Sequence, residues 1–315
     1  MKKLLQLTVA ILFSNFTLTA QTVTWAHNFG GTDNDGGNHI ATDAGGNTYV
    51  TGYYSGTAFF DAQVIISLGG KDAFLVKYNA AGNAQWAATI GGTGNDEGSA
   101  VSVDGSGNIY VAGFYASPSI TTTAGILNNS GGEDIFFLKY NSSGTLLNAV
   151  KAGGSGYEKC LGICNDASGN LYATGYIAGT QGCSFGSTTL TGTGVSSMFI
   201  AKYNSSLAAQ WASKAGGLGA SGNVRGTSIA VDFAGAPFVV GPFLGGADFV
   251  VQQFTALGNT DMFLARYYSN NGNLNTAYQY SGTSAASRIN PTSLKMDGSG
   301  FCNVTGYFKT NAVLG

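Results

Sequence analysis

Charged side chains are scarce in this sequence of 315 residues, in which 14 Lys and Arg and 16 Asp and Glu make up 10% of the chain. A typical globular domain has about 25% charged residues. The formal net charge is −2. The chain therefore lacks the basic surface that attracts nucleic acid or anionic lipid, and we expect neither as a partner. With two His and three Arg, it also has little material for general acid–base catalysis.

Cysteine is scarce as well, with four residues in the whole chain. This number is too small for a disulfide framework in a chain of this length. Cys160 and Cys164 lie four residues apart in a predicted strand, or roughly 13 Å along it, which is too far for a disulfide between them. Cys183 could reach one of the two. We therefore interpret the thiols as buried and free, or as forming a single disulfide.

Long hydrophobic runs are missing after the first 20 residues. In that first stretch Lys2 and Lys3 precede the apolar run LLQLTVAILF, and TLTA ends at Ala20 before Gln21. This is the pattern of a secretory signal peptide, and the run is too short to span a bilayer. Residues 1–20 are therefore predicted to be a signal peptide. We expect the mature protein to be secreted or held at the cell surface, with no integral membrane span.

Glycine is abundant instead, with 49 residues, and much of it belongs to a repeat. Five times along the chain, an Asp opens a segment of the form Asp-x-x-Gly, and another Gly follows nine residues after that Asp. The intervals between successive Asp residues are 61, 62, 66 and 65 residues. The Asp and Gly pairs are Asp43 with Gly52, Asp104 with Gly113, Asp166 with Gly175, Asp232 with Gly241, and Asp297 with Gly306.

Each repeat contains four segments that alternate in polarity or are rich in β-branched and aromatic residues, as β-strands are. Within the Asp-x-x-Gly-Asn segment, Asp favours a turn by bonding nearby backbone amides, and Gly tolerates a positive φ. No segment has a sustained 3.6-residue apolar period with helix caps, so we expect almost no helix. In the second repeat the predicted strands are 99–104, 108–115, 134–141 and 146–154.

Four antiparallel strands repeated at a fixed period predict an all-β fold, a β-propeller with four-stranded blades. The repeat of about 61–66 residues gives four full units and part of a fifth. A β-solenoid is the alternative, although its rungs are usually shorter. Residues 21–315 are the predicted propeller domain. We expect this domain to be truncated at its C-terminal end because the fifth unit has only two predicted strands. The segment 22–28 aligns with the fourth strands, so we expect it to complete the last blade.

These motifs resemble the SBBP family of bacterial β-propeller repeats. The resemblance rests on Asp-x-x-Gly-Asn-x-Tyr-Val-x-Gly, on Asp-x-Phe-Leu-x-Lys-Tyr and on a Trp followed by Gly-Gly, and it covers about residues 22–310. It implies an exported propeller, often within a larger surface protein and without an assigned activity. The resemblance therefore supports the fold and the compartment more than it supports a function.

The candidate functional residues are carboxylates in glycine-rich loops. Asp33 and Asp35 lie in GGTDNDGG, and Asp96 and Glu97 lie at the same phase in GGTGNDEG. Oxygen-rich, flexible loops of this kind can hold Ca²⁺, so these four residues are candidate calcium ligands; no other cofactor is expected. In the third repeat, Glu158 is the one acid left at this place in the loop. A solvated loop without a metal ion is the alternative interpretation.

The predicted topology places these acidic loops on one face of the propeller, together with the long segments 55–70, 116–132, 178–195 and 244–259. Long, variable loops are where binding sites are usually built, so we expect a protein or glycan ligand on this face. An Asp that recurs once per blade is interpreted as structural. The sequence thus predicts an exported binding or structural module, and the alternative is a propeller enzyme such as a lyase or a glycan hydrolase.

Overall fold

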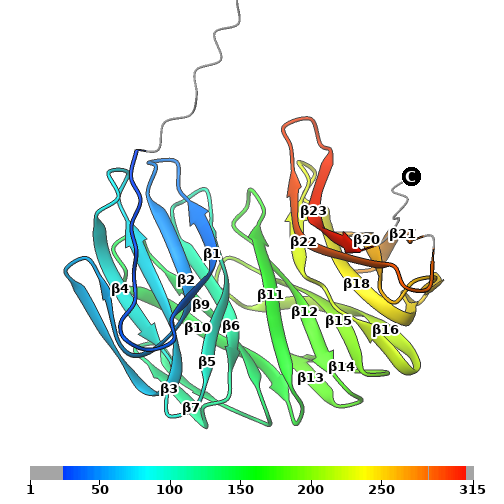
Figure 1. Cartoon of the computed structure of the whole chain (residues 1–315), viewed down its shortest axis with the longest axis horizontal. Helices are drawn as coiled ribbons and strands as arrows, with labels where there is room; N and C mark the ends of the chain where they lie inside the picture. The colour runs from blue at the N-terminus through cyan, green and yellow to red at the C-terminus, as the bar shows by residue number, and fades with distance from the viewer. Residues whose placement is uncertain (1–23, 283, 310–315) are drawn as a thin grey trace, which may run out of the picture.

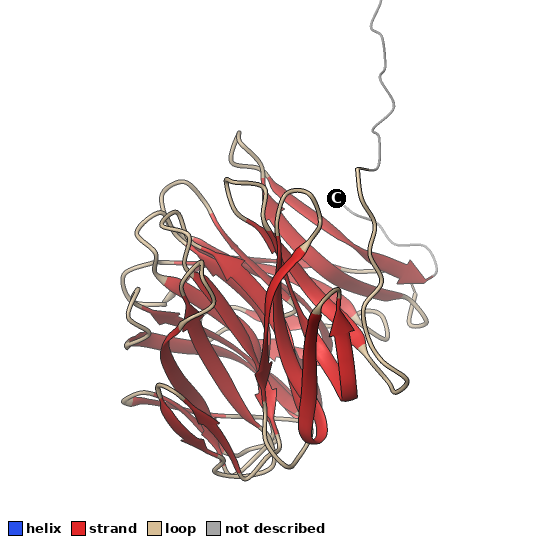
Figure 2. Cartoon of the chain, turned by 90° about the vertical axis from the view of Figure 1, so that its left-hand side faces the viewer, coloured by secondary structure: helices blue, strands red, loops and turns tan. Residues whose placement is uncertain are grey.

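The computed structural model describes residues 24–282 and 284–309, and every regular element within them is a β-strand (Figures 1 and 2). The prediction of an all-β fold is therefore confirmed. The predicted signal peptide, residues 1–20, lies outside the described residues. None of the described elements is a helix that is long and apolar enough to cross a membrane.

The strands form four four-stranded units followed by a two-stranded one, and each unit pairs its strands in antiparallel order. Unit 1 contains β1 (Gly36–Thr42), β2 (Thr48–Phe60), β3 (Gln63–Tyr78) and β4 (Ala84–Ile90). Unit 2 contains β5 (Asp96–Val103), β6 (Ile109–Tyr115), β9 (Asp134–Tyr140) and β10 (Leu146–Gly154). Unit 3 contains β11 (Glu158–Asn165), β12 (Leu171–Ala178), β15 (Ser196–Tyr203) and β16 (Ala209–Val224). Unit 4 contains β17 (Ser228–Val231), β18 (Pro237–Asp248), β20 (Asp261–Tyr267) and β21 (Leu274–Tyr280), and unit 5 contains β22 (Arg288–Met296) and β23 (Cys302–Lys309).

The units follow one another across the molecule in chain order, from blue to red in Figure 1. The first strands of successive units lie side by side, so that β1 contacts β5, β5 contacts β11, β11 contacts β17 and β17 contacts β22. Sheets that radiate from a row of innermost strands are the arrangement of propeller blades. The β-propeller prediction is confirmed in this sense.

The repeated Asp builds the turn between the first and second strands. Oδ1 of Asp104 accepts hydrogen bonds from the amides of Ser106 and Asn108, both at 2.9 Å. Its Oδ2 accepts hydrogen bonds from Nδ2 of Asn108 at 2.8 Å and from the hydroxyl of Tyr110 at 3.2 Å. Asp43 and Asp166 make the same four bonds in their own turns. The structural interpretation of this Asp is therefore confirmed.

The Gly nine residues after the Asp is required by a close approach of two strands. A Cβ on Gly113 would overlap the carbonyl oxygen of Glu97, next to the place where the pairing of β5 with β6 shifts register between Gly98 and Ala100. Such a shift is a β-bulge, which brings a backbone group of one strand toward its neighbour. The equivalent Gly of each other unit is placed in the same way against a backbone carbonyl of its unit: Gly52, Gly175, Gly241 and Gly306.

The long segments between the second and third strands form further β-hairpins, whereas the sequence suggested variable loops. β2 and β3 extend beyond their unit in the first of these hairpins. The others contain β7 (Ser119–Thr122) with β8 (Gly125–Asn128), β13 (Gly182–Phe185) with β14 (Thr188–Thr191), and β18 with β19 (Gln253–Thr255). β13 also pairs with β10, and β16 pairs with β18, so hydrogen bonds join neighbouring units.

The hydrophobic core lies mainly between the units. The largest cluster joins residues of units 2 and 3, and its rings include Phe137 and Tyr203, whose centroids are 4.7 Å apart. A second cluster joins units 3 and 4, and a third joins units 1 and 2. All four Cys are free thiols, and Cys160 and Cys183 are buried in the first of these clusters, so no disulfide forms between them.

A polar junction also joins unit 1 to unit 2 and unit 3 to unit 4. Nζ of Lys77 and Nε1 of Trp86, both in unit 1, donate hydrogen bonds to the carbonyl oxygen of Ser142 in the turn between β9 and β10, at 2.9 and 3.3 Å. Lys202 and Trp211 of unit 3 bond the carbonyl of Ser269 in the same way, at 3.0 and 3.1 Å. The recurring Lys and Trp are therefore contacts between units.

Candidate functional site

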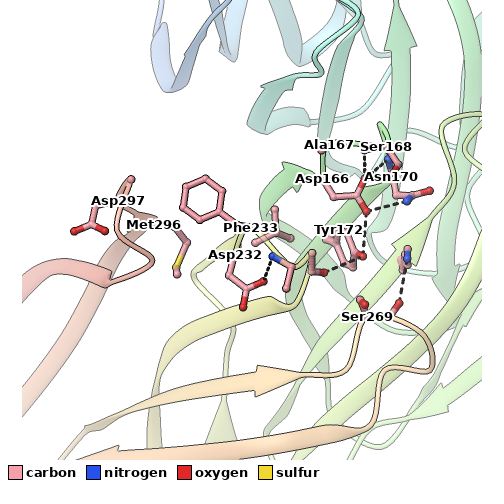
Figure 3. A pocket seen from close by; sticks show the side chains of 15 residues that line it. Asp166, Ala167, Ser168, Asn170, Tyr172, Asp232, Phe233, Ser269, Met296 and Asp297 are labelled. Atoms are coloured by element: carbon pink, nitrogen blue, oxygen red, sulfur yellow. Dashed lines mark hydrogen bonds between the residues drawn. The ribbon is translucent and has the colours of Figure 1, made fainter.

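A cavity with a volume of about 600 Å³ lies where the Asp turns of units 3, 4 and 5 converge. We call the end of the blades that carries these turns the tight-turn face, and the end that carries the extra hairpins the loop face. We call the cavity the turn cavity. Its walls include Asp166, Ser168, Asn170, Tyr172, Lys202, Val231, Asp232, Phe233, Ser269, Met296 and Asp297 (Figure 3).

Unit 3 provides one wall of the cavity through its hydrogen-bonded Asp166 turn. Asp166 accepts the amides of Ser168 and Asn170 and the side chain of Asn170, at 2.8 to 3.0 Å. The hydroxyl of Tyr172 bonds Oδ2 of Asp166 at 3.3 Å and also lies 3.4 Å from the carbonyl oxygen of Gly235 in unit 4. One tyrosine therefore links the turns of two units at the cavity wall.

Unit 4 stabilises its turn differently. Ala236 and Phe238 stand where the turns of units 1 to 3 have Asn and Tyr, so Asp232 lacks those two side-chain donors. Arg266 replaces them, because its Nη2 lies 3.0 Å from Oδ2 of Asp232. The guanidinium also lies 5.4 Å from the centre of the Phe238 ring. Here Arg266 occupies the position of the junction Lys of the earlier units and serves its own turn.

Phe233 is the residue that distinguishes the turn cavity. It is the second residue of its turn, where the other four turns have Ala44, Gly105, Ala167 and Gly298. Its side chain is 82% exposed, and in Figure 3 its ring lies between Met296 and the Asp166 turn. The sequence interpretation missed this residue, although its departure from the repeat was visible there.

The four predicted calcium ligands lie on the loop face, and two of them have structural partners. Asp35 accepts the amides of Gly31 and Ser55, at 2.6 and 3.1 Å. Asp96 is 1% exposed, and its two oxygens accept the amides of Gly92, Ala116 and Ser117 and the hydroxyl of Ser117. These two carboxylates therefore fasten the start of a first strand to the backbone beside it.

The other two predicted ligands are separate from this arrangement. Asp33 is exposed beside Gly56, and Glu97 accepts a hydrogen bond from Nδ2 of Asn38 at 2.9 Å. Among residues 24–282 and 284–309, no three His, Cys, Asp or Glu side chains come together in a group that could hold a metal ion. The calcium hypothesis stays a prediction.

Buried acids line the contacts between units on the loop face. Asp72, Asp134 and Glu158 are each 0% exposed, and in the described part of the chain one carboxylate oxygen of each has no hydrogen-bond partner. Burial raises the pKa of Asp72 to about 6, and Asp96 nearby adds to the effect. Burial likewise raises the pKa of Glu158 to about 7, with Asp134 contributing in the same direction. We therefore expect these contacts between units to depend on pH near neutrality.

The repeated four-stranded units, the row of first strands and the cavity between turns define the class of protein: a β-propeller repeat domain, of the binding or structural kind. Residues 85–113 match the model of the SBBP family, described as a beta-propeller repeat. This segment runs from β4 through β5 to β6 and includes the junction Trp86, the turn Asp104 and the bulge Gly113. The chain therefore carries the SBBP beta-propeller repeat.

One curated relative is an uncharacterized WD repeat-containing protein, L264, from Acanthamoeba polyphaga mimivirus. The two sequences are 30% identical over 153 residues. The match takes in 43% of this chain and only 11% of the relative, so it compares repeats and not whole proteins.

Proposed function

We propose that this chain is an exported β-propeller module that binds a protein or glycan ligand at the turn cavity, outside the cell or at its surface. The observation that carries the proposal is Phe233. A side chain that only maintained the turn would be small, as it is in the four other turns, because the turn is held by its Asp. A large aromatic side chain exposed in the turn cavity instead supplies apolar area that a ligand can cover.

The experiment compares two exposed phenylalanines in equivalent turns. Phe233 lines the turn cavity, whereas Phe301 is 69% exposed in the Asp297 turn and does not line it. Fluorescently labelled wild-type, Phe233→Ala and Phe301→Ala proteins are added to producing cells that lack the gene, and the bound fluorescence is measured. We expect Phe233→Ala alone to lose binding. Equal binding by all three proteins would overturn the assignment of the site.

Export is tested separately. The charged start and the apolar run of residues 1–20 support cleavage before Gln21. Mass spectrometry of the protein recovered outside the cell should give a chain that begins at Gln21. A secreted form that still carries Met1 would contradict this part of the proposal.

The loop face is a second candidate binding surface, because its hairpins differ between units and carry exposed apolar residues. Val250 and Val251 at the tip between β18 and β19 are 80% and 78% exposed. Replacing both with Ser leaves the turn cavity unchanged. Loss of cell binding in this variant, with normal binding by Phe233→Ala, would move the site to the loop face.

A further inference from the structure

Three of the polar groups around the turn cavity, Asp232, Lys202 and Asp166, already have partners within the protein. Asp232 is paired with Arg266 at 3.0 Å, and Nζ of Lys202 donates to the carbonyl of Ser269 at 3.0 Å while it lies 5.1 Å from the centre of the Tyr172 ring. Asp166 accepts four hydrogen bonds within its own turn. A strongly charged ligand would have to disturb these pairs, whereas a neutral polar ligand would not.

The apolar surface of the cavity is a platform rather than a closed pocket. The exposed ring of Phe233 lies next to Met296 in Figure 3, and most of the other residues that line the cavity are polar. Ser168 lies on the side of unit 3, and Asp297 lies on the side of unit 5, with a carboxylate at the surface whose Oδ1 accepts the amides of Ser299 and Phe301. A flat aromatic face with hydrogen-bonding groups at its edge fits a flat ligand that is apolar on its faces and polar around its rim.

We infer that the turn cavity binds a neutral saccharide ring, which stacks on Phe233 and directs its hydroxyl groups toward the polar residues that line the cavity. A pyranose ring has C–H groups on its faces and hydroxyl groups around its edge, so its two kinds of surface match those of the cavity. The inference rests on the proposed function, since it names the ligand class for the same site.

The test is affinity electrophoresis in native gels that contain neutral polysaccharides: an α-glucan, a β-glucan, a mannan and a galactan. We expect at least one of them to retard the wild-type protein and the Phe301→Ala control. Phe233→Ala should bind about tenfold or more weakly, because the stacking surface is lost. Phe233→Trp should bind at least as well as the wild type. Retardation should be the same at 50 and 500 mM salt, since no charge is neutralised.

The outcomes separate the two claims. Retardation by none of the four polysaccharides, or retardation that Phe233→Ala leaves unchanged, overturns the saccharide inference. If Phe233→Ala still loses binding to cells, the proposed site survives and its ligand belongs to another class. Retention of the protein on a lysine-rich peptide, lost in Phe233→Ala and weakened by salt, would identify that class as cationic. Phe233→Ala should keep the wild-type melting temperature, since its side chain is exposed, so a loss of binding will not reflect unfolding.

Discussion

The indole ring of Trp86 lies over Gly144, in the turn of the next unit, so that a Cβ on Gly144 would come within 2.9 Å of the ring. Trp211 covers Gly272 in the same way. The junction between units 2 and 3 departs from this pattern in both units. Asn148 replaces the Trp, and Leu207, 1% exposed and with a φ of 59°, replaces the turn Gly. The leucine side chain takes the space that an indole ring fills elsewhere.

The first prediction follows from this exchange. Gly144→Leu should lower the free energy of unfolding by about 1–3 kcal/mol, because the new side chain meets Trp86 and because Gly144 has a φ of 85°. Asn148→Trp should be destabilising alone, since Leu207 occupies its space. Adding Leu207→Gly to Asn148→Trp should recover part of the loss. Urea unfolding of Asn148→Trp, Leu207→Gly and the double variant measures the coupling between the two positions. Additive effects of the two substitutions on the free energy of unfolding would contradict the argument.

The turn Asp residues provide the second prediction. Asp104→Ala should destabilise the protein by roughly 0.5–2 kcal/mol, the range for an Asp that accepts backbone amides at a comparable cap. Asp297→Ala, in the exposed turn of unit 5, is the matched control and should have a smaller effect. Thermal unfolding compares the two variants. A larger loss from Asp297→Ala would be inconsistent with the burial of the Asp104 turn.

Burial alone would raise the pKa of Asp104, but the hydrogen bonds from Asn108, Ser106 and Tyr110 together hold the pKa below its usual range. The same holds for Asp43, with Asn47 as the main donor. A lowered pKa stabilises the folded chain above the pKa of the unfolded chain. This contribution is lost as the pH falls through the folded pKa, so these turns should weaken only in strong acid.

The third prediction concerns the buried acids, which titrate in the opposite sense. Asp72 and Glu158 have pKa values of about 6 and about 7 in the folded chain, against about 4 when unfolded. The folded chain therefore holds more protons between these values, and the free energy of unfolding should fall as the pH rises from about 4 to 7. Glu158→Gln should flatten this part of the curve and raise the melting temperature at pH 8.

Glu97→Gln is the control for the third prediction, because Glu97 lies on the loop face, is only partly buried and is hydrogen-bonded to Asn38. At pH 8 the melting temperature of Glu97→Gln should stay close to that of the wild type, unlike that of Glu158→Gln. Glu158 is also close to Asp134, Lys151 and Glu133, so the curves are best measured in the full chain with those residues intact. A wild-type melting temperature that rises between pH 5 and 7 would refute the assignment.

The fourth prediction separates the acids of the loop face by role. Asp96→Asn should destabilise the protein by about 1–3 kcal/mol, because an amide places N–H groups against backbone N–H donors that are buried there. Asp33→Asn should be nearly neutral, since Asp33 is exposed. Differential scanning calorimetry decides between the two. Equal stability of both variants would mean that Asp96 does not fasten its loop.

The fifth prediction tests calcium. If the loop face binds this ion, calcium should raise the melting temperature of the wild type and should have no effect on a variant with Asp33→Asn and Glu97→Gln. Asp35 and Asp96 are left unchanged because their replacement would loosen the loops without any metal. The absence of a calcium effect on the wild type would reject the calcium hypothesis and leave these carboxylates with structural roles.

The features that the sequence predicted well depend on neighbours along the chain. The Asp104 turn is built within seven residues, from Asp104 to Tyr110, so the local sequence contains every group needed to predict it. The strands follow from polarity and residue type in the same local way. The β13–β14 hairpin escaped prediction because its pairing with β10 joins Gly154 to Cys183, in a different unit. A contact of that kind leaves no periodic pattern in either segment.

The candidate site was harder to predict for a related reason. The local sequence around an Asp in a glycine-rich loop does not show whether that Asp binds an ion or backbone amides. Only the fold shows that the amide of Gly92 lies beside Asp96. The turn cavity depends on three turns that are more than 60 residues apart in the chain. Comparison of the repeats with one another could have indicated Phe233, because the departure of one unit from the others does not require the fold.

The junction of Trp86 with Gly144 is divided between two repeats, and this constrains how such a chain can grow by duplication. A second copy of unit 2 inserted directly after the first would set Asn148 against a turn that carries Gly144, and neither an indole ring nor a leucine side chain would fill the space between them. A void of this kind is destabilising. A duplication is therefore tolerated best when the duplicated segment contains both the Trp of one unit and the turn Gly of the next. Such a segment begins in one blade and ends in the following one, so its boundaries differ from those of a blade.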